Sequence, residues 1–281
     1  LIELDCSSNK LTSLDLSKNT KLKKLYCSDN ELTALDVSKS PKLIYLHCGW
    51  NKIKTLDVTN HKYLKDLYCE KNKLTELKLG KKRDLDNLNC SDNKLQKLDL
   101  SGCTALQESF SCNNNKLTKL DVSMCSKLEI LKCYGNRLTE LNVEGLKELW
   151  ILDCSNNRLK TLSIKGCKMI YNLNCKNNRL TKLDVSPSKR MTYLVCKSNK
   201  IVELKFGKLH KLSSLDCTNN KIKKLDIAEA TNLVGLACSK NKITKLDISN
   251  FKKLMSLRYD GDKIKNLDTS NNPKLTNIKT K

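Results

Sequence analysis

Cysteine and histidine are the side chains of this sequence best suited to act as nucleophile, general base or metal ligand. The 281 residues include 15 cysteines but only three histidines, His47, His61 and His210. A nucleophilic cysteine needs a base such as histidine within hydrogen-bond reach. His47 directly precedes Cys48, and neighbouring residues of a strand point to opposite faces, so we expect these two side chains not to meet.

Aspartate is the other candidate for chemistry, because it recurs once in most of the repeats described below. Stacked side chains of one sign bind a metal weakly without a second type of ligand, so we interpret the aspartates as turn formers. The sequence also contains no Cys-x-x-Cys, His-Glu-x-x-His or phosphate-binding glycine loop. We therefore predict a protein that is not an enzyme, with no metal site and no cofactor. The aspartates are Asp15, Asp36, Asp57, Asp99, Asp121, Asp184, Asp226, Asp247 and Asp268.

Twelve of the cysteines recur at a nearly constant interval, and each is followed three residues later by an asparagine. The interval is 21 residues, except between Cys90 and Cys112, where it is 22. Self-similarity at this period is typical of a solenoid, in which each repeat buries its apolar side against its neighbours. Tyr259 and Asp262 take the two positions in a thirteenth repeat. The ladder cysteines are Cys6, Cys27, Cys48, Cys69, Cys90, Cys112, Cys133, Cys154, Cys175, Cys196, Cys217 and Cys238.

The repeat predicts one short strand and a short return path in every coil. Leu25 and Cys27 alternate with Tyr26, so leucine and cysteine face inward on a parallel strand. The ladder asparagine follows the strand and is expected to bridge backbone groups of successive coils. We predict a leucine-rich repeat solenoid of about 13 coils of 21 residues, with a parallel β-sheet on the concave face and extended or 3₁₀ segments on the convex face. Residues 1–281 are expected to form a single domain.

The cysteines are expected to be reduced. Parallel Cβ vectors on adjacent parallel strands fit disulfide geometry poorly, and a thiol is a compact apolar filler. Cys103, Cys125 and Cys167 lie outside the ladder, and Cys103 with Cys125 is the one plausible disulfide. In the 22-residue repeat, one inserted residue precedes Phe110, which predicts a local bulge.

Positive charge is concentrated at one position of the repeat. The net charge is +23, and the residue after the ladder asparagine is Lys or Arg in twelve of thirteen repeats. This position predicts a basic edge along the sheet, which either serves solubility or contacts a polyanion. Charges on the concave face itself nearly balance, which argues against specific nucleic-acid binding there. The edge residues predicted to contact a polyanion are Lys73, Lys94, Lys116, Arg137, Arg158 and Arg179.

Aromatic residues gather on the concave face of repeats two to four. Only 5% of the chain is aromatic, so this grouping indicates a ligand site, although tyrosine also suits a solvated strand. A second, weaker group includes Tyr134 and Trp150, with Tyr171 and Tyr193 nearby. The residues of the first group are Tyr26, Tyr45, His47, Trp50 and Tyr68.

The unit Leu-x-x-Leu-x-Cys-x-x-Asn-x-Leu-Thr-x-Leu-Asp-Val-Ser, from Leu22 to Ser38, resembles the cysteine-ladder repeats of internalin-J-like members of the internalin family. The resemblance covers the whole array. It implies a secreted or wall-attached bacterial protein that recognises host or neighbouring-cell molecules through its concave face. Leu1 begins in register, so we expect a piece of a larger surface protein whose signal and anchor lie outside this chain.

Two classes of function follow. The first is a recognition or adhesion module that binds a protein or glycan ligand on the concave face. The alternative is a structural surface protein held to anionic wall polymer or glycosaminoglycan by the basic edge. No stretch approaches the roughly 18 apolar residues of a membrane span, so we expect no membrane insertion within the chain.

Overall fold

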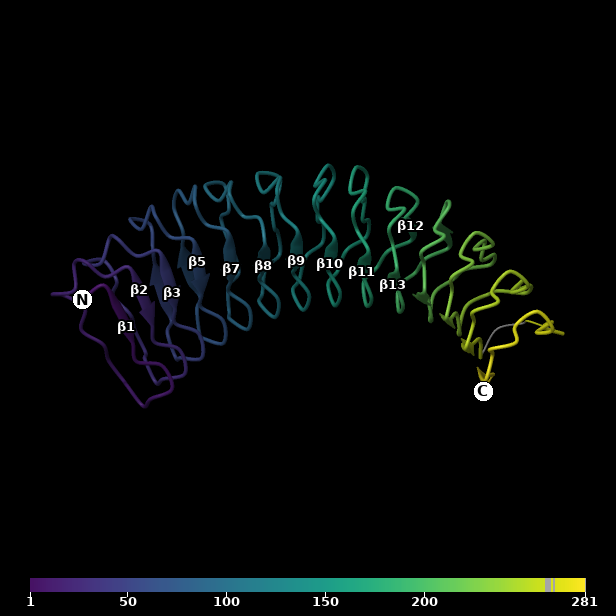
Figure 1. The fold of residues 1–281 in the computed structure, drawn as a ribbon, viewed down its shortest axis with the longest axis horizontal. Coiled ribbons are helices and arrows are strands. Elements are labelled where there is room, and N and C mark those ends of the chain that lie inside the picture. Colours follow the sequence, from purple (N-terminus) through teal and green to yellow (C-terminus); the bar gives the residue numbers. More distant parts are fainter. Residues whose placement is uncertain (261–263, 265, 281) are drawn as a thin grey trace. The chain divides into compact units, whose positions relative to one another are not determined.

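The computed structural model describes residues 1–260, 264 and 266–280. The chain is a parallel β-solenoid of about 13 coils, and the described residues contain no helix. It divides into two compact units, unit 1 (Leu1–Leu138) and unit 2 (Thr139–Lys281). Figure 1 shows successive coils of each unit stacked in sequence order. The predicted fold class is confirmed, and the single domain stays a prediction.

Each coil of unit 1 contributes one three-residue strand to a parallel sheet. Each strand pairs in register with the strand of the next coil, so that, for example, Leu25 is the partner of Leu46. A smaller sheet on the opposite side of the coils pairs β4 (Thr55–Asp57) with β6 (Glu76–Lys78). The strands of the main sheet are β1 (Glu3–Asp5), β2 (Lys24–Tyr26), β3 (Tyr45–His47), β5 (Asp66–Tyr68), β7 (Asn87–Asn89), β8 (Ser109–Ser111) and β9 (Ile130–Lys132).

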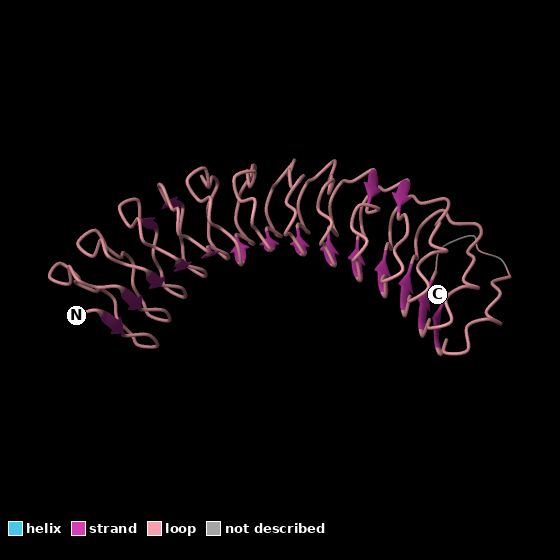
Figure 2. Ribbon diagram, turned by 45° about the horizontal axis from the view of Figure 1, so that its top comes forward, coloured by secondary structure: helices cyan, strands magenta, loops and turns pink. Residues whose placement is uncertain are grey.

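Unit 2 repeats this arrangement. Its smaller sheet pairs β12 (Lys182–Asp184) with β14 (Glu203–Lys205). Figure 2 shows, within each unit, the main strands along one side of the coils and the turns along the other. We call the solvent side of the main strands the sheet face. The main strands are β10 (Ile151–Asp153), β11 (Asn172–Asn174), β13 (Tyr193–Val195), β15 (Ser214–Asp216), β16 (Gly235–Ala237), β17 (Ser256–Arg258) and β18 (Asn277–Lys279).

The ladder cysteines fill the core as thiols. None of the fifteen cysteines, all of them described, forms a disulfide, and every ladder cysteine after Cys6 is buried. Burial raises the pKa of the Cys27 and Cys175 thiols to about 12, so both stay protonated at neutral pH. The predicted reduced ladder is therefore confirmed.

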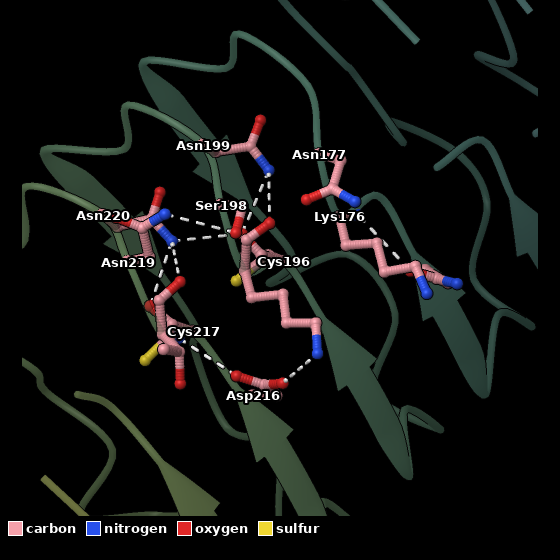
Figure 3. A network of polar contacts seen from close by, with 12 residues as sticks. Lys176, Asn177, Cys196, Ser198, Asn199, Asp216, Cys217, Asn219 and Asn220 are labelled. Carbon is pink, nitrogen blue, oxygen red and sulfur yellow. Dashed lines mark hydrogen bonds and ion pairs between the residues drawn. The ribbon is translucent and has the colours of Figure 1, made fainter. Parts of the chain in front are cut away.

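The ladder asparagines join successive coils, as predicted. The side-chain amide of Asn220 donates to the Cys196 carbonyl of the preceding coil at 3.1 Å and to the Cys217 carbonyl of its own coil at 3.0 Å. Its Oδ1 accepts the Ile201 backbone N–H at 3.0 Å. Figure 3 shows the amides of Asn199 and Asn220 in equivalent positions. One side chain thus satisfies buried backbone groups of two coils.

The aspartates of the return path form turns. Oδ1 of Asp36 accepts the backbone N–H of Ser38 at 2.8 Å, and the same bond recurs at the other aspartates except Asp226, which lies 3.9 Å from the Lys224 ammonium. Hydrogen bonding lowers the pKa of the Asp36 carboxyl. Among the described residues, no group of three or more His, Cys, Asp or Glu side chains is placed to hold a metal. The interpretation of these aspartates as turn formers is confirmed for all but Asp226.

Two consecutive β-turns follow each aspartate and share one inward-pointing residue, which we call the turn-core position. In the second coil this residue is Ser40, whose N–H donates to Val37 O and whose carbonyl accepts from Leu43 N–H. The i→i+3 bonds are those of 3₁₀ structure, but each turn stays separate. Extended segments and turns therefore form the return path that we predicted as extended or 3₁₀.

The turn-core position explains the three cysteines outside the ladder. Cys103, Cys125 and Cys167 all occupy it and are fully buried. The Cys125 thiol lies 3.6 Å from the Cys103 carbonyl oxygen, and the two cysteines are not joined. The disulfide considered from the sequence is therefore absent, because both thiols serve as filler for the turns.

The 22-residue coil absorbs its extra residue before the strand. Gln107 and Glu108 lie between the buried Leu106 and β8, where other coils have one residue. Phe110 is buried and pairs in register with Leu88 and Leu131. The extra residue predicted as a bulge therefore lies before the strand and leaves the sheet pairing intact. Among the described residues there is no helix with the length and apolar character needed to cross a membrane.

Candidate recognition surface

Three predicted site residues form a contiguous aromatic row on the sheet face of unit 1. Tyr26, His47 and Tyr68 occupy the same position on β2, β3 and β5 and are direct Cα partners. The Tyr26 and His47 rings meet edge to face at 4.9 Å, and the His47 and Tyr68 rings lie 4.5 Å apart. Half-buried rings in contact are restrained before any ligand arrives.

The row is electrically neutral near pH 7. Burial lowers the pKa of His47 more than the nearby Asp66 carboxylate raises it. Burial also raises the pKa of the Tyr68 hydroxyl, with Asp66 acting in the same direction. The row therefore presents uncharged rings whose polar tips can hydrogen-bond, which is the chemistry of interface anchors.

Tyr45 lies in a second row, two residues before His47 on the same strand. Its Cα partners are Lys24 on β2 and Asp66 on β5. The Lys24 ammonium lies 5.9 Å from the Tyr45 ring centre and also pairs with Glu3 at 3.1 Å. Tyr45 is thus half-buried between a cation and a carboxylate, where it can contribute a ring and a hydroxyl.

Trp50 lies on the turn that follows β3 and is strained. Its φ is +54°, and the equivalent turn position has positive φ in nearly every coil. Serine, aspartate, asparagine, lysine or glycine fill that position elsewhere, whereas a bulky aromatic residue rarely adopts it. The indole is 52% exposed, and the Lys71 ammonium lies 3.2 Å from its centre. An exposed tryptophan held in an unfavourable conformation is typical of a binding residue.

Gly49 and Glu70 belong to this surface, and the sequence analysis did not assign them to the site. A Cβ at Gly49 would lie 2.8 Å from Oε1 of Glu70, so the glycine makes room for the carboxylate. Oε2 of Glu70 is buried and has no hydrogen-bond partner among the described residues, and burial raises the Glu70 pKa. Gly49 is the only glycine directly after a ladder cysteine, and that exception was the available signal.

We call Tyr26, Tyr45, His47, Trp50 and Tyr68 the aromatic patch. All five lie on coils two to four of unit 1, as predicted. The three residues of the row touch, Tyr45 lies beside the row, and Trp50 contacts the next coil through Lys71. Its role in binding stays a prediction.

The second aromatic group is less concentrated. Tyr134 follows β9 in unit 1, whereas Trp150 precedes β10 in unit 2. Trp150 is 41% exposed, and its ring meets Tyr171 edge to face at 6.0 Å. Within unit 2 this pair forms a smaller aromatic contact than the row of unit 1.

The basic edge is exposed in both units. Most of the edge residues are held in place by a backbone hydrogen bond to the preceding coil, as the Lys94 N–H donates to Leu74 O at 2.8 Å. Of the described edge residues, only Lys52 forms an ion pair, with Glu31 at 2.9 Å. Lys263 lies outside the described residues. The predicted contact residues Lys73, Lys94, Lys116 and Arg137 in unit 1, and Arg158 and Arg179 in unit 2, are all exposed.

The histidines are dispersed, as the sequence analysis expected. His47 lies on the sheet face, while the Cys48 thiol beside it is in the core, where burial raises its pKa. His61 is buried at the turn-core position, with Nε2 3.0 Å from Val37 O. His210 is exposed, 3.7 Å from Glu229. Absence of enzymatic activity stays a prediction.

Comparison with solved structures identifies similar solenoids. The functional domain of InlJ from Listeria monocytogenes, which includes a cysteine ladder, is 34% identical with a TM-score of 0.78. The match covers 93% of this chain and 63% of the InlJ domain, so this chain spans less than two thirds of that structure. No family model matches the sequence, and no curated protein matches it.

Two further structures extend the likeness. A leucine-rich repeat protein of Leptospira interrogans is 26% identical with a TM-score of 0.79, over 99% of this chain and 83% of that one. An internalin, InlF, from Listeria monocytogenes has a TM-score of 0.79 at 20% identity, over 99% of this chain and 86% of that one. At that identity the InlF comparison shows the fold alone.

Proposed function

Since the chain is a cysteine-ladder leucine-rich repeat protein of internalin-like architecture, we propose that it is the recognition module of a bacterial secreted or cell-surface protein. In this proposal it is not catalytic and binds a protein on a host or neighbouring cell through the aromatic patch. Leucine-rich repeat solenoids of this kind act as interaction modules through such faces.

One observation carries the proposal: three rings in contact lie beside a strained, exposed Trp50 on a single stretch of sheet. The core explains the ladder and its asparagines, but it does not require aromatic residues on the solvent side. Interface hot spots are enriched in tryptophan and tyrosine held in rigid surroundings. The unpartnered Glu70 oxygen beside them offers an acceptor for a donor of the ligand.

Binding to intact cells tests the proposal. Fluorescently labelled protein is applied to a panel of eukaryotic and bacterial cells, with and without trypsin treatment of the cell surface. Trp50→Ala and Tyr45→Ala should each weaken binding at least about tenfold, because central aromatic anchors contribute about 2 kcal/mol or more. Trypsin treatment should abolish binding if the ligand is a protein.

Trp150→Ala is the matched control, because it removes the only other tryptophan of the chain from the second aromatic group. It should bind as the unchanged protein does, and all three variants should keep its melting temperature. Loss of binding in Trp150→Ala alone would move the site to unit 2. Equal binding by all three would refute recognition through either aromatic group.

The alternative is attachment of the basic edge to an anionic wall polymer. Wall attachment is favoured because the cations of the basic edge are exposed. Among the described edge residues, all except Lys52 lack an ion pair with any described residue. Charge reversal at Lys94, Lys116 and Arg137 should then abolish binding to purified teichoic acid. The unchanged protein should lose that binding between low and moderate salt, because many weak charge contacts are screened. If binding does not depend on salt, or if it survives the charge reversal, the wall-attachment alternative is wrong and the basic edge serves only solubility.

A further inference from the structure

The sheet face of unit 2 contains a hollow where unit 1 has rings. It has a volume of about 200 Å³ and lies over β15, β16, β17 and β18. Gly235 and Ala237 form its floor, and a Cβ placed on Gly235 would meet nothing within 4 Å. Ser214 and Asp216 border it on one side, and Arg258 on the other. The short side chains of one strand therefore leave a depression one strand wide.

A second hollow of about 410 Å³ adjoins the first at the turns that follow these strands. Arg258 and Lys279 line both hollows, so they mark the point where the two meet. The turn residues Ser198 and Asn219 add polar groups to the second hollow. Figure 3 shows Ser198 and Asn219 close together on successive turns, where the Asn219 amide donates to the Ser198 hydroxyl at 3.3 Å.

The carboxylates of this region already have partners. Asp216 accepts the Thr218 backbone N–H at 3.1 Å and lies 3.4 Å from the Lys197 ammonium. Asp260 accepts a hydrogen bond from the Ser239 hydroxyl. Both acids keep their negative charge, and the pKa of Asp260 is lowered by its hydrogen bond from Ser239 and, to a smaller extent, by the nearby Arg258 and Lys240 cations.

Four cations line the two hollows, against the two carboxylates of Asp216 and Asp260. Lys240, Arg258 and Lys279 form no ion pair with any residue that the structure describes, and all three are exposed. The sequence analysis found the charges of the whole sheet face nearly balanced. The structure shows that positive charge is nevertheless in excess around this one hollow.

We propose that the unit 2 hollow is a second interaction site, which binds a short acidic segment of a protein partner. The Arg258 guanidinium is planar and takes a carboxylate with two parallel hydrogen bonds. The hollow over Gly235 and Ala237 accepts one side chain of the segment. Lys240 and Lys279 attract the neighbouring carboxylates, and the polar turn residues are available to the peptide backbone.

The dimensions and charges favour a short peptide over a long polyanion. Four parallel strands extend over about 15–20 Å, which is the length of a few extended residues. The site offers four cations against the two carboxylates of Asp216 and Asp260, and these carboxylates repel a densely sulfated chain. A segment with two or three carboxylates matches this balance. The site lies in unit 2 and does not depend on the role of the aromatic patch in unit 1.

Fluorescence anisotropy on the full chain tests the proposal, with fluorescein-labelled tetraglutamate as the probe and tetraglutamine as its uncharged comparator. Tetraglutamate should bind at low salt and tetraglutamine should not. Arg258→Gln should weaken tetraglutamate binding about tenfold, because a bidentate charged contact is lost. Gly235→Tyr should weaken it similarly by filling the hollow, and other coils tolerate tyrosine at this strand position, as Tyr45 and Tyr193 show.

Lys132→Gln is the matched control, because Lys132 occupies in unit 1 the strand position that Arg258 occupies in unit 2. It should bind tetraglutamate as the unchanged protein does. Equal weakening by Lys132→Gln and Arg258→Gln would overturn the proposal in favour of general charge attraction. A sulfated tetrasaccharide that binds more tightly than tetraglutamate and is lost in Arg258→Gln would overturn it in favour of carbohydrate. No tetraglutamate binding at low salt would also overturn it.

Discussion

The sheet face carries opposite surfaces in the two units, although the strands beneath it are built alike. In coils two to four of unit 1 the residues before the ladder cysteines form the aromatic row, whose rings touch. In unit 2 the same position holds Asp216, Ala237 and Arg258, and a hollow lies over it. One surface is filled and neutral, whereas the other is open and basic.

This difference shows that the residues of the sheet face can change from coil to coil while the residues of the core stay much the same. Inward leucines and cysteines set the register of every strand, and the ladder asparagines fix the spacing of the coils. Residues of the sheet face alternate with these and do not take part in that packing. A single scaffold can therefore carry two binding surfaces of different chemistry.

The largest expected effect tests whether the two cores are equivalent. Asn51→Ala in unit 1 and Asn220→Ala in unit 2 remove amides that make the same set of bonds to two coils. Each should lower the free energy of unfolding by about 3 kcal/mol, because buried backbone groups lose their partners. Urea unfolding followed by circular dichroism measures both. Losses that differ by more than about 1 kcal/mol would break the equivalence of the cores.

The next prediction compares matched turns of the two units. Coil four contains Leu77-Lys78-Leu79-Gly80-Lys81-Lys82, and coil ten contains Leu204-Lys205-Phe206-Gly207-Lys208-Leu209. The turn-core residue is Lys82 in the first and Leu209 in the second, and both are buried. The Lys82 ammonium donates to Leu79 O at 2.5 Å and to Thr59 O at 3.3 Å, and burial lowers its pKa.

Lys82→Leu should therefore raise the free energy of unfolding by about 1–2 kcal/mol at pH 7, because a buried charge is replaced by an apolar side chain. The folded-state pKa of Lys82 lies below the unfolded value of 10.5, so its penalty is complete at low pH and fades as the pH approaches 10.5. The advantage of Lys82→Leu should shrink accordingly in urea titrations at pH 7 and pH 10. A destabilised Lys82→Leu would show that the two carbonyl bonds outweigh desolvation.

Much of this architecture could be predicted from the sequence because each coil repeats the same constraints. The 21-residue period was enough to predict the strands, the buried ladder thiols and the bridging asparagines, because each of these features depends only on residues at a fixed spacing in the neighbouring coils. The turn-core position was missed, although Cys103, Cys125 and Cys167 share one spacing from the ladder. It is filled by Ser40, His61 and Lys82 in other coils, so no residue type reveals it.

The candidate sites were less predictable, because they depend on contacts that vary from coil to coil. The aromatic row could be found because register places Tyr26, His47 and Tyr68 in line. The unit 2 hollow could not, because it results from short side chains at Gly235 and Ala237. A sequence gives the residue type at each position. A hollow, in contrast, depends on how short side chains on one strand compare with the longer side chains on the neighbouring strands.

A smaller effect is expected from the strained turn of unit 1. Trp50→Asn should raise the free energy of unfolding by about 0.5–1 kcal/mol, since relief of a left-handed conformation exceeds the loss of an exposed cation–π contact. Asn177→Trp, at the same turn position in unit 2, should lower it by about 1 kcal/mol. Thermal unfolding of both variants measures the pair. A destabilised Trp50→Asn would mean that Trp50 packs as a structural residue, which would weaken the case for the aromatic patch.

The smallest expected effect concerns the neutrality of the aromatic row. Burial lowers the pKa of His47 in the folded protein, while Asp66 opposes this shift. The folded state therefore takes up its proton at lower pH than the unfolded chain, and stability falls as the pH drops below the unfolded value of about 6.5. His47→Phe keeps a ring between Tyr26 and Tyr68 but cannot be protonated, so it should lose less stability than the unchanged protein between pH 7.5 and pH 5. An NMR titration should place the His47 midpoint below 6.5. A midpoint above that value would show that Asp66 prevails and that the row is a charged surface at mildly acidic pH, which would bring it closer in character to the basic hollow of unit 2.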